Sequence, residues 1–226
     1  MSRRRLLGAA TRGSTALLVS GGVAAVLGGC SLLPASYRFR MRVDANASTG
    51  SVSGSTVCEV TAFKVARVLS EERAGGGGLR GEALVLDLPG RRVFVLLTIS
   101  GEGFDLEPAV TRALSGGKRP ANVDEYVAAV RSLGSWFGSA KADLPRVDWP
   151  LMVAFRDARD ARSMERVNPA EIGVRRISLE TTNDAITTGI DEKLPWLQAA
   201  EKFRYNGTPA GELYPLPAWD FRSGTK

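Results

Sequence analysis

Histidine is absent from the 226 residues of this sequence, and several common chemistries are absent with it. Histidine is the most frequent general base in enzymes and the most frequent neutral metal ligand in proteins. A chain without it can build neither a Ser-His-Asp nor a Cys-His catalytic arrangement, nor a zinc site that contains histidine. No carboxylate spacing singles out a catalytic pair either, so the sequence predicts no catalytic residue, no cofactor and no metal site.

Cysteine is also scarce, with Cys30 and Cys58 as the two examples. If Cys30 carries lipid, Cys58 stands alone and no intrachain disulfide can form. A thiol without a histidine partner lacks its usual activating base, which disfavours a nucleophilic role for Cys58. Because Cys58 lies on the apolar face of a predicted strand, we expect it in the core.

Acidic residues are missing from the first 29 positions, which hold Arg3, Arg4, Arg5 and Arg12. Removing these four from the 30 basic residues leaves 26 against 24 acidic residues, so the net charge falls from +6 to +2. Proteins that bind nucleic acid present a strongly basic surface to the phosphates. The nearly balanced remainder therefore predicts no nucleic-acid partner.

A hydrophobic run long enough to span a membrane is missing near the amino terminus. The run from Ala16 to Leu27 has about a dozen residues, whereas a permanent transmembrane helix needs about 20. It follows the basic stretch Arg3–Arg5 and ends at the small residues Gly28 and Gly29. This three-part layout predicts a signal peptide over residues 1–29.

The end of that segment, Leu27-Gly28-Gly29-Cys30, resembles the lipobox of bacterial lipoproteins. The resemblance implies cleavage before Cys30, a diacylglycerol on its thiol and acylation of the new amino terminus, palmitate being an example. Each buried methylene contributes about 0.8 kcal/mol, so two or three chains anchor a protein durably in a membrane. Ser31 replaces the aspartate associated with inner-membrane retention, which favours the outer membrane, with the protein facing the periplasm.

The export route stays open between two alternatives. Ser2–Leu7 (SRRRLL) resembles the twin-arginine export motif, and it fits the basic start of an ordinary secretory signal equally well. After the signal peptide, the composition predicts a lipidated tether over residues 30–36 and a β-rich globular domain over 37–200. Residues 201–226 are rich in proline and aromatic side chains and are expected to form an extended tail.

Alternating and β-branched segments predict about six strands in the globular domain. These strands are expected over residues 37–44, 56–66, 79–88, 92–100, 151–155 and 174–181. Helical spacing predicts a helix over 107–114, capped by Asp105, and a second that starts after Asn122 and reaches Trp136 and Phe137. Residues 45–55 and 71–78 are expected to be a turn and a flexible loop. The pattern favours an antiparallel α+β fold, with a β-sandwich as the alternative.

Several motifs permit a functional and a structural interpretation. Gly76–Gly81 matches GxGxxG but leads into a strand, so no dinucleotide site is predicted. Arg38, Arg40 and Arg42 could contact anionic lipid head groups, although pairing with Glu59 and other acids across the sheet is favoured. Four carboxylates are interpreted as solvated loop charge; these are Asp157, Asp160, Asp184 and Asp191.

The carboxy-terminal third resembles an uncharacterised family of proteobacterial envelope proteins. The resemblance is carried by Leu151–Asp157, Val167-Asn168-Pro169, Thr187-Thr188-Gly189-Ile190 and Leu194-Pro195-Trp196-Leu197. The hairpin Tyr37–Val60 and Arg80-Gly81-Glu82-Ala83 also fit it. The family implies no activity and supplies no site residues. We therefore expect a non-enzymatic envelope lipoprotein that binds a protein partner or a cell-wall component. A carboxylate-dependent hydrolase of envelope glycans and a carrier of an amphiphile are the alternatives.

The partner surface is expected on Thr187–Trp219, where prolines keep aromatic side chains available as anchors. The alternative is that these aromatics, among them Trp196, Tyr205, Tyr214 and Trp219, fold back and cover an apolar face of the domain.

Overall fold

A long antiparallel hairpin of β1 (Ala35–Ala47) and β2 (Gly50–Lys64) forms the centre of the fold. The computed structural model describes residues 34–47, 50–64, 75–99, 106–135, 139–199 and 218–224, all within one unit, Leu32–Lys226. Every second residue of β1 from Ala35 to Ala45 is buried, because alternate side chains of a strand point to opposite faces. The predicted strand and its buried face are confirmed.

The hairpin is longer than the sequence predicted. Residues 45–55 were expected to form a turn, but Ala45 pairs with Val52 and Ala47 with Gly50. The small residues of this stretch serve packing, since a Cβ on Gly54 would lie 2.7 Å from the backbone oxygen of Val85. Their size lets another strand approach closely, a requirement that composition alone does not reveal.

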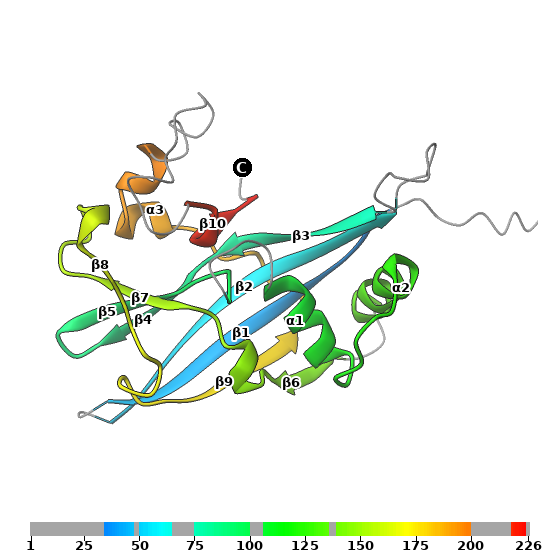
Figure 1. The fold of residues 1–226 in the computed structure, drawn as a ribbon, viewed down its shortest axis with the longest axis horizontal. Helices are drawn as coiled ribbons and strands as arrows, with labels where there is room; N and C mark the ends of the chain where they lie inside the picture. The colour runs from blue at the N-terminus through cyan, green and yellow to red at the C-terminus, as the bar shows by residue number, and fades with distance from the viewer. Residues whose placement is uncertain are drawn as a thin grey trace, which may run out of the picture. The chain divides into compact units, whose positions relative to one another are not determined.

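The described residues form ten strands in two antiparallel sheets (Figure 1). The first sheet has the order β10-β3-β2-β1-β9-β6, and the second has the order β4-β5-β7-β8. The further strands of the first sheet are β3 (Gly75–Glu82), β6 (Lys141–Asp143), β9 (Val174–Thr181) and β10 (Arg222–Ser223). Those of the second are β4 (Leu84–Leu88), β5 (Arg91–Val95), β7 (Met152–Phe155) and β8 (Met164–Arg166). The α+β prediction is confirmed, with the strands divided between two sheets rather than gathered in one.

Two predictions about the glycine-rich region are wrong. Gly75–Gly78 were expected in a loop but belong to β3, where they pair with β2; positions 71–74 lie outside the described residues. The single strand predicted over 79–88 is divided, because the chain passes from the first sheet to the second at Ala83. Gly81 permits this passage with a φ of 154°, at a point where a Cβ would touch the Cys58 side chain.

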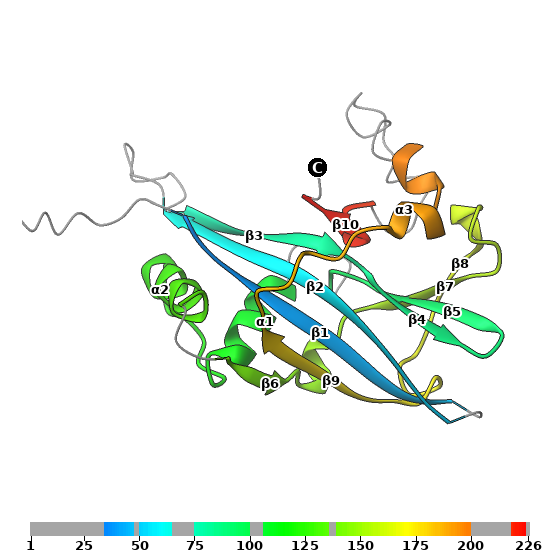
Figure 2. The same ribbon diagram turned by 180° about the vertical axis from the view of Figure 1, so that it is seen from behind.

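Helices α1 (Leu106–Leu114) and α2 (Val123–Leu133) pack on the inner face of the first sheet (Figures 1 and 2). Both helices were predicted. Asn122 caps α2 by accepting a hydrogen bond from the Glu125 backbone at 2.9 Å, and Glu125 in turn accepts one from the Ala121 backbone at 3.1 Å. The predicted cap Asp105 and the residues Trp136 and Phe137 lie outside the described residues.

The second sheet separates two hydrophobic clusters. Val93 and Val95 of β5 belong to the main core, whereas Phe94 belongs to a smaller cluster with Leu194 and Leu197. β5 is therefore covered on both faces, as its continuous apolar sequence predicted. The loop that carries Asp157 and Asp160 leads into β8. Asn168 starts a tight turn, in which its side chain accepts a hydrogen bond of 3.0 Å from the Ala170 backbone.

The domain was predicted to end at residue 200, but it also includes residues 218–224. Phe221 is completely buried in the smaller cluster, and the following strand β10 pairs with β3. Trp196, half-buried, meets the Phe221 ring edge-on at 5.4 Å. For Trp196 the folding-back alternative is confirmed. Residues 201–217, with Tyr205 and Tyr214, lie outside the described residues, as does the side chain of Trp219. No helix among those described has the length and apolarity needed to cross a bilayer.

Candidate binding site

Four carboxylates are buried among the described residues although the sequence singled out none of them: two glutamates, Glu82 and Glu107, and two aspartates, Asp148 and Asp220. Asp148 is paired with Arg112. Glu82 and Glu107 are each 4% exposed. A buried ionised carboxylate is costly unless hydrogen bonds or cations compensate for lost hydration. How each is compensated therefore separates a structural group from one that is available to a ligand.

Glu107 occupies the first turn of α1 and lies against the inner face of β3. A Cβ on Gly77 would overlap its carboxylate, so glycine at this position makes room for the acid. The sequence did carry a signal for this placement. Glu107, Val110, Thr111 and Leu114 recur at helical spacing, and all four are buried, so Glu107 belongs to the apolar face of its own helix.

One hydroxyl group compensates the Glu107 carboxylate. Tyr126 of α2 donates a hydrogen bond to its Oε1. Thr111, one turn further along α1, shares a hydrogen bond of 2.9 Å with the buried Tyr37 hydroxyl. Burial raises the pKa of Tyr37, and the nearby Glu107 charge raises it further. Tyr37 therefore stays a neutral hydroxyl beside the acid.

Burial raises the pKa of Glu107 from 4.5 to about 7. Loss of hydration is the cause of this shift, and no cation of the described residues offsets it. A carboxyl group held in this way is close to half-ionised at neutral pH. It can therefore accept a proton, release one, or pair with an incoming cation.

The carboxylate borders a hollow of about 540 Å³ between β3, α1 and the start of α2, which we call the Glu107 pocket. Its described lining combines glycine backbone, proline and small apolar residues with three charged groups. The lining residues are Gly76, Gly77, Glu107, Pro108, Arg112, Arg119, Pro120, Ala121, Asn122, Val123 and Tyr126. Arg112 is already paired with Asp148 at 2.7 Å, whereas Arg119 is exposed and meets no partner among the described residues. Glu107 is the one acid in this lining.

Glu82 is compensated by the fold itself. Its Oε2 accepts a hydrogen bond of 2.8 Å from the Ile190 backbone, and Arg222 and Asp191 form an ion pair beside it. Burial raises the pKa of Glu82; the Ile190 hydrogen bond and the Arg222 charge oppose the shift, whereas the Asp191 charge adds to it. Glu82 thus holds the carboxy-terminal residues against the junction of the two sheets.

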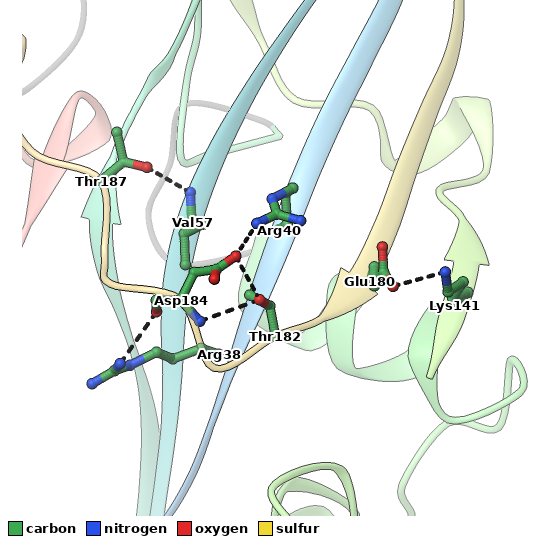
Figure 3. Close-up of polar contacts among 8 residues, drawn as sticks. All are labelled: Arg38, Arg40, Val57, Lys141, Glu180, Thr182, Asp184 and Thr187. Atoms are coloured by element: carbon green, nitrogen blue, oxygen red, sulfur yellow. Dashed lines mark hydrogen bonds and ion pairs between the residues drawn. The ribbon is translucent and has the colours of Figure 1, made fainter. Parts of the chain in front are cut away.

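This junction explains the Thr187-Thr188-Gly189-Ile190 motif. The Thr187 backbone donates to the Val57 oxygen at 3.1 Å, and its hydroxyl accepts from the Val57 nitrogen at 2.9 Å (Figure 3). Gly189 then adopts a φ of 112°, which turns the chain so that Ile190 reaches Glu82. The motif therefore has a structural role, and no described hollow involves it.

The arginine stripe lies on the outer face of the first sheet, and each arginine has an acidic partner there. Arg38 is 3.6 Å from Glu59, and Arg42 is 2.9 Å from Asp44. Arg40 pairs with Asp184, which the Thr182 hydroxyl also contacts (Figure 3). Cross-strand pairing is confirmed for Arg38 and Glu59, whereas Arg42 pairs within its own strand β1 and Arg40 pairs with the segment that follows β9.

The remaining predicted residues have local roles. Asp157 and Asp160 each accept a hydrogen bond of 2.9 Å from the backbone N–H of the residue two positions later in the chain, which stabilises turns. Asp191 pairs with Arg222. Cys58 is completely buried and unpaired, as predicted, and burial raises the pKa of its thiol to about 12, so it is not a nucleophile. Cys30 and the predicted signal peptide lie outside the described residues.

Comparison with known proteins adds no relative: no family model, no curated protein and no solved structure matches this chain. Within the part of the chain that the structure describes, no three potential metal ligands come together.

Proposed function

We propose that this protein is a lipid-anchored lipoprotein of the bacterial envelope whose domain binds a partner in the Glu107 pocket without chemical conversion. The observation that carries the binding role is the Glu107 carboxylate, buried at a pocket wall with one hydroxyl as its partner. Such a group lowers the stability of the folded protein at neutral pH, which is typical of a functional site.

The pocket favours binding over glycan hydrolysis. Glycosidases of the usual type need two carboxyl groups on opposite sides of the scissile bond, about 5 to 9.5 Å apart. Glu107 is the one acid among the described lining residues. A second hollow of about 550 Å³ beside Arg38 and Glu59 is lined mainly by hydroxyl, amide and charged groups, which does not suit an amphiphile carrier.

Anchoring rests on the sequence of residues 1–31 and is tested separately. A labelled fatty acid should be incorporated into the native protein and not into Cys30→Ser. Equal labelling of the variant, or native protein free in the periplasm, would contradict the anchor. Fractionation of the labelled envelope then tests the proposed outer-membrane location, which Ser31 supports.

Binding at the pocket is tested by crosslinking in the producing cells. A photoreactive amino acid at Arg119, on the pocket rim, should give a crosslinked adduct. The same group at the exposed Lys141, on β6 at the opposite edge of the sheet, should not. Ala121→Trp, which fills the pocket, should abolish the Arg119 adduct without lowering the melting temperature. If the Arg119 adduct still formed in the Ala121→Trp variant, the pocket would be ruled out as the binding site.

A further inference from the structure

The two edges of the six-stranded sheet are protected very differently. Edge strand β6 has three residues, and its Lys141 and Asp143 form ion pairs of 2.7 Å with neighbours on β9. A short, charged edge discourages further strand pairing. At the other side, β10 covers Gly81 and Glu82 of β3. Gly224, which follows β10, lies against Arg80, whereas Gly75–Leu79 have no strand partner on that side among the described residues.

The open part of β3 presents backbone groups to its surroundings. The Ala83 nitrogen donates to the Phe221 oxygen at 2.8 Å, so residues of odd number face β10. Alternation then directs the N–H and C=O groups of Gly77 and Leu79 toward the same, open side. Four glycines at 75–78 leave these groups without side chains to shield them, and no proline interrupts the edge.

The Glu107 pocket adjoins this edge. Residues opposite each other in paired strands point to the same face of a sheet. A residue paired with Gly77 would therefore point its side chain to the inner face, where Glu107 and the pocket lie. On the outer face the Phe63 ring lies over Gly76 and is 42% exposed, which offers an apolar contact to the next residue of an added strand.

The charge of the pocket selects the side chain. Oε2 of Glu107 receives no hydrogen bond from the described residues, since Tyr126 donates to Oε1. The cation of Arg112 is already engaged by Asp148, and Arg119 lies exposed at the rim. A buried carboxylate with a vacant acceptor and no paired cation attracts an ammonium or guanidinium group.

We propose that an extended peptide segment of a partner protein adds to β3 along Gly75–Leu79 and inserts a lysine or arginine side chain into the Glu107 pocket. This inference rests on the proposed function, because it specifies the occupant of the same pocket. Backbone hydrogen bonds along the edge supply affinity, and the pocket supplies specificity, as in other cases of strand addition.

The test uses the full-length protein in detergent and a library of proline-free ten-residue peptides. Bound peptides should be enriched at least fivefold in lysine or arginine at one position. Replacing that lysine with norleucine, which removes the charge and keeps the chain, should weaken binding to the native protein at least tenfold. Against Glu107→Gln the lysine and norleucine peptides should bind equally, because the variant keeps the shape of the acid and lacks its charge.

Methylation of alternate backbone nitrogens in the peptide blocks strand pairing and leaves the side chains in place. It should abolish binding. A library without basic enrichment, or methylated peptides that bind as well as their parents, overturns strand addition with a basic anchor. In that case the Arg119 crosslink of living cells still decides the proposed function, since it depends on the pocket and on no assumption about the occupant.

Discussion

Glu82 and Glu107 are the same residue type with the same 4% exposure, and burial raises the pKa of both. Glu82 accepts a backbone hydrogen bond from Ile190 with Arg222 nearby, so the fold supplies its compensation. Glu107 has one tyrosine hydroxyl and borders a pocket. The difference shows that the partners of a buried acid, and not its burial, distinguish a structural group from a candidate binding group.

The largest effect is expected from Phe221→Ala, which removes the cluster that holds the carboxy-terminal residues beside Glu82. Phe221 is fully buried against Phe94, Phe155 and Trp196. Emptying such a site costs about 3–5 kcal/mol. Denaturant unfolding should show this loss, and truncation after Gly207 should lose at least as much. A truncated protein of unchanged stability would mean that residues 218–224 are not part of the core.

Glu107→Gln should change stability in the opposite direction. The raised pKa of Glu107 gives a contribution that is fully present below pH 4.5 and is lost as the pH rises through about 7. A shift from 4.5 to about 7 corresponds to a loss on the order of 3 kcal/mol for the native protein. The variant avoids this loss, so it should be more stable than the native protein at pH 8 and similar to it at pH 4.5. Unfolding at both pH values measures the difference.

Glu82→Leu should destabilise, because it leaves the Ile190 N–H without an acceptor and removes an acid beside Arg222. An unsatisfied buried donor costs about 1–3 kcal/mol. Glu82→Gln keeps an acceptor oxygen and serves as the matched control with a smaller loss. If Glu82→Leu were as stable as Glu107→Gln at pH 8, the contrast between the two acids would disappear.

The smallest effect is expected at Cys58, whose neutral thiol lies beside Glu82. Its thiol should resist a labelling reagent in the folded protein and react after denaturation, because it is completely buried. Cys58→Ser should cost about 1 kcal/mol, since a buried hydroxyl needs a hydrogen-bond partner more than a thiol does. Rapid labelling of the folded protein would place that strand face at the surface.

The sequence predicted those elements whose periodicity is local. Tyr37–Val43, the buried run around Val93 and the α2 helix after Asn122 all lie where the pattern placed them. It missed elements that depend on distant partners. Gly75–Gly78 form a strand because β2 pairs with them, and Phe221 is core because a chain end returns to β3.

The candidate site was missed for a related reason. A glutamate in a short helix is normally solvated, and the signal that it faced inward was its spacing from Val110 and Leu114. The helical spacing therefore indicated that the Glu107 side chain faces inward. The glycine that receives the acid comes from β3, at least 25 residues earlier along the chain, and the pocket beside it is completed by the start of α2.

The most direct test of the account is the titration of Glu107 itself. Carbon-13 labelling of glutamate side chains, with Glu107→Gln to assign the signal, gives the pKa of this carboxyl group by nuclear magnetic resonance. The account predicts a value of about 7 in the free protein, which falls when a lysine-containing peptide occupies the pocket. A value near 4.5 in the free protein would contradict it, because Glu107 would then be solvated or already paired.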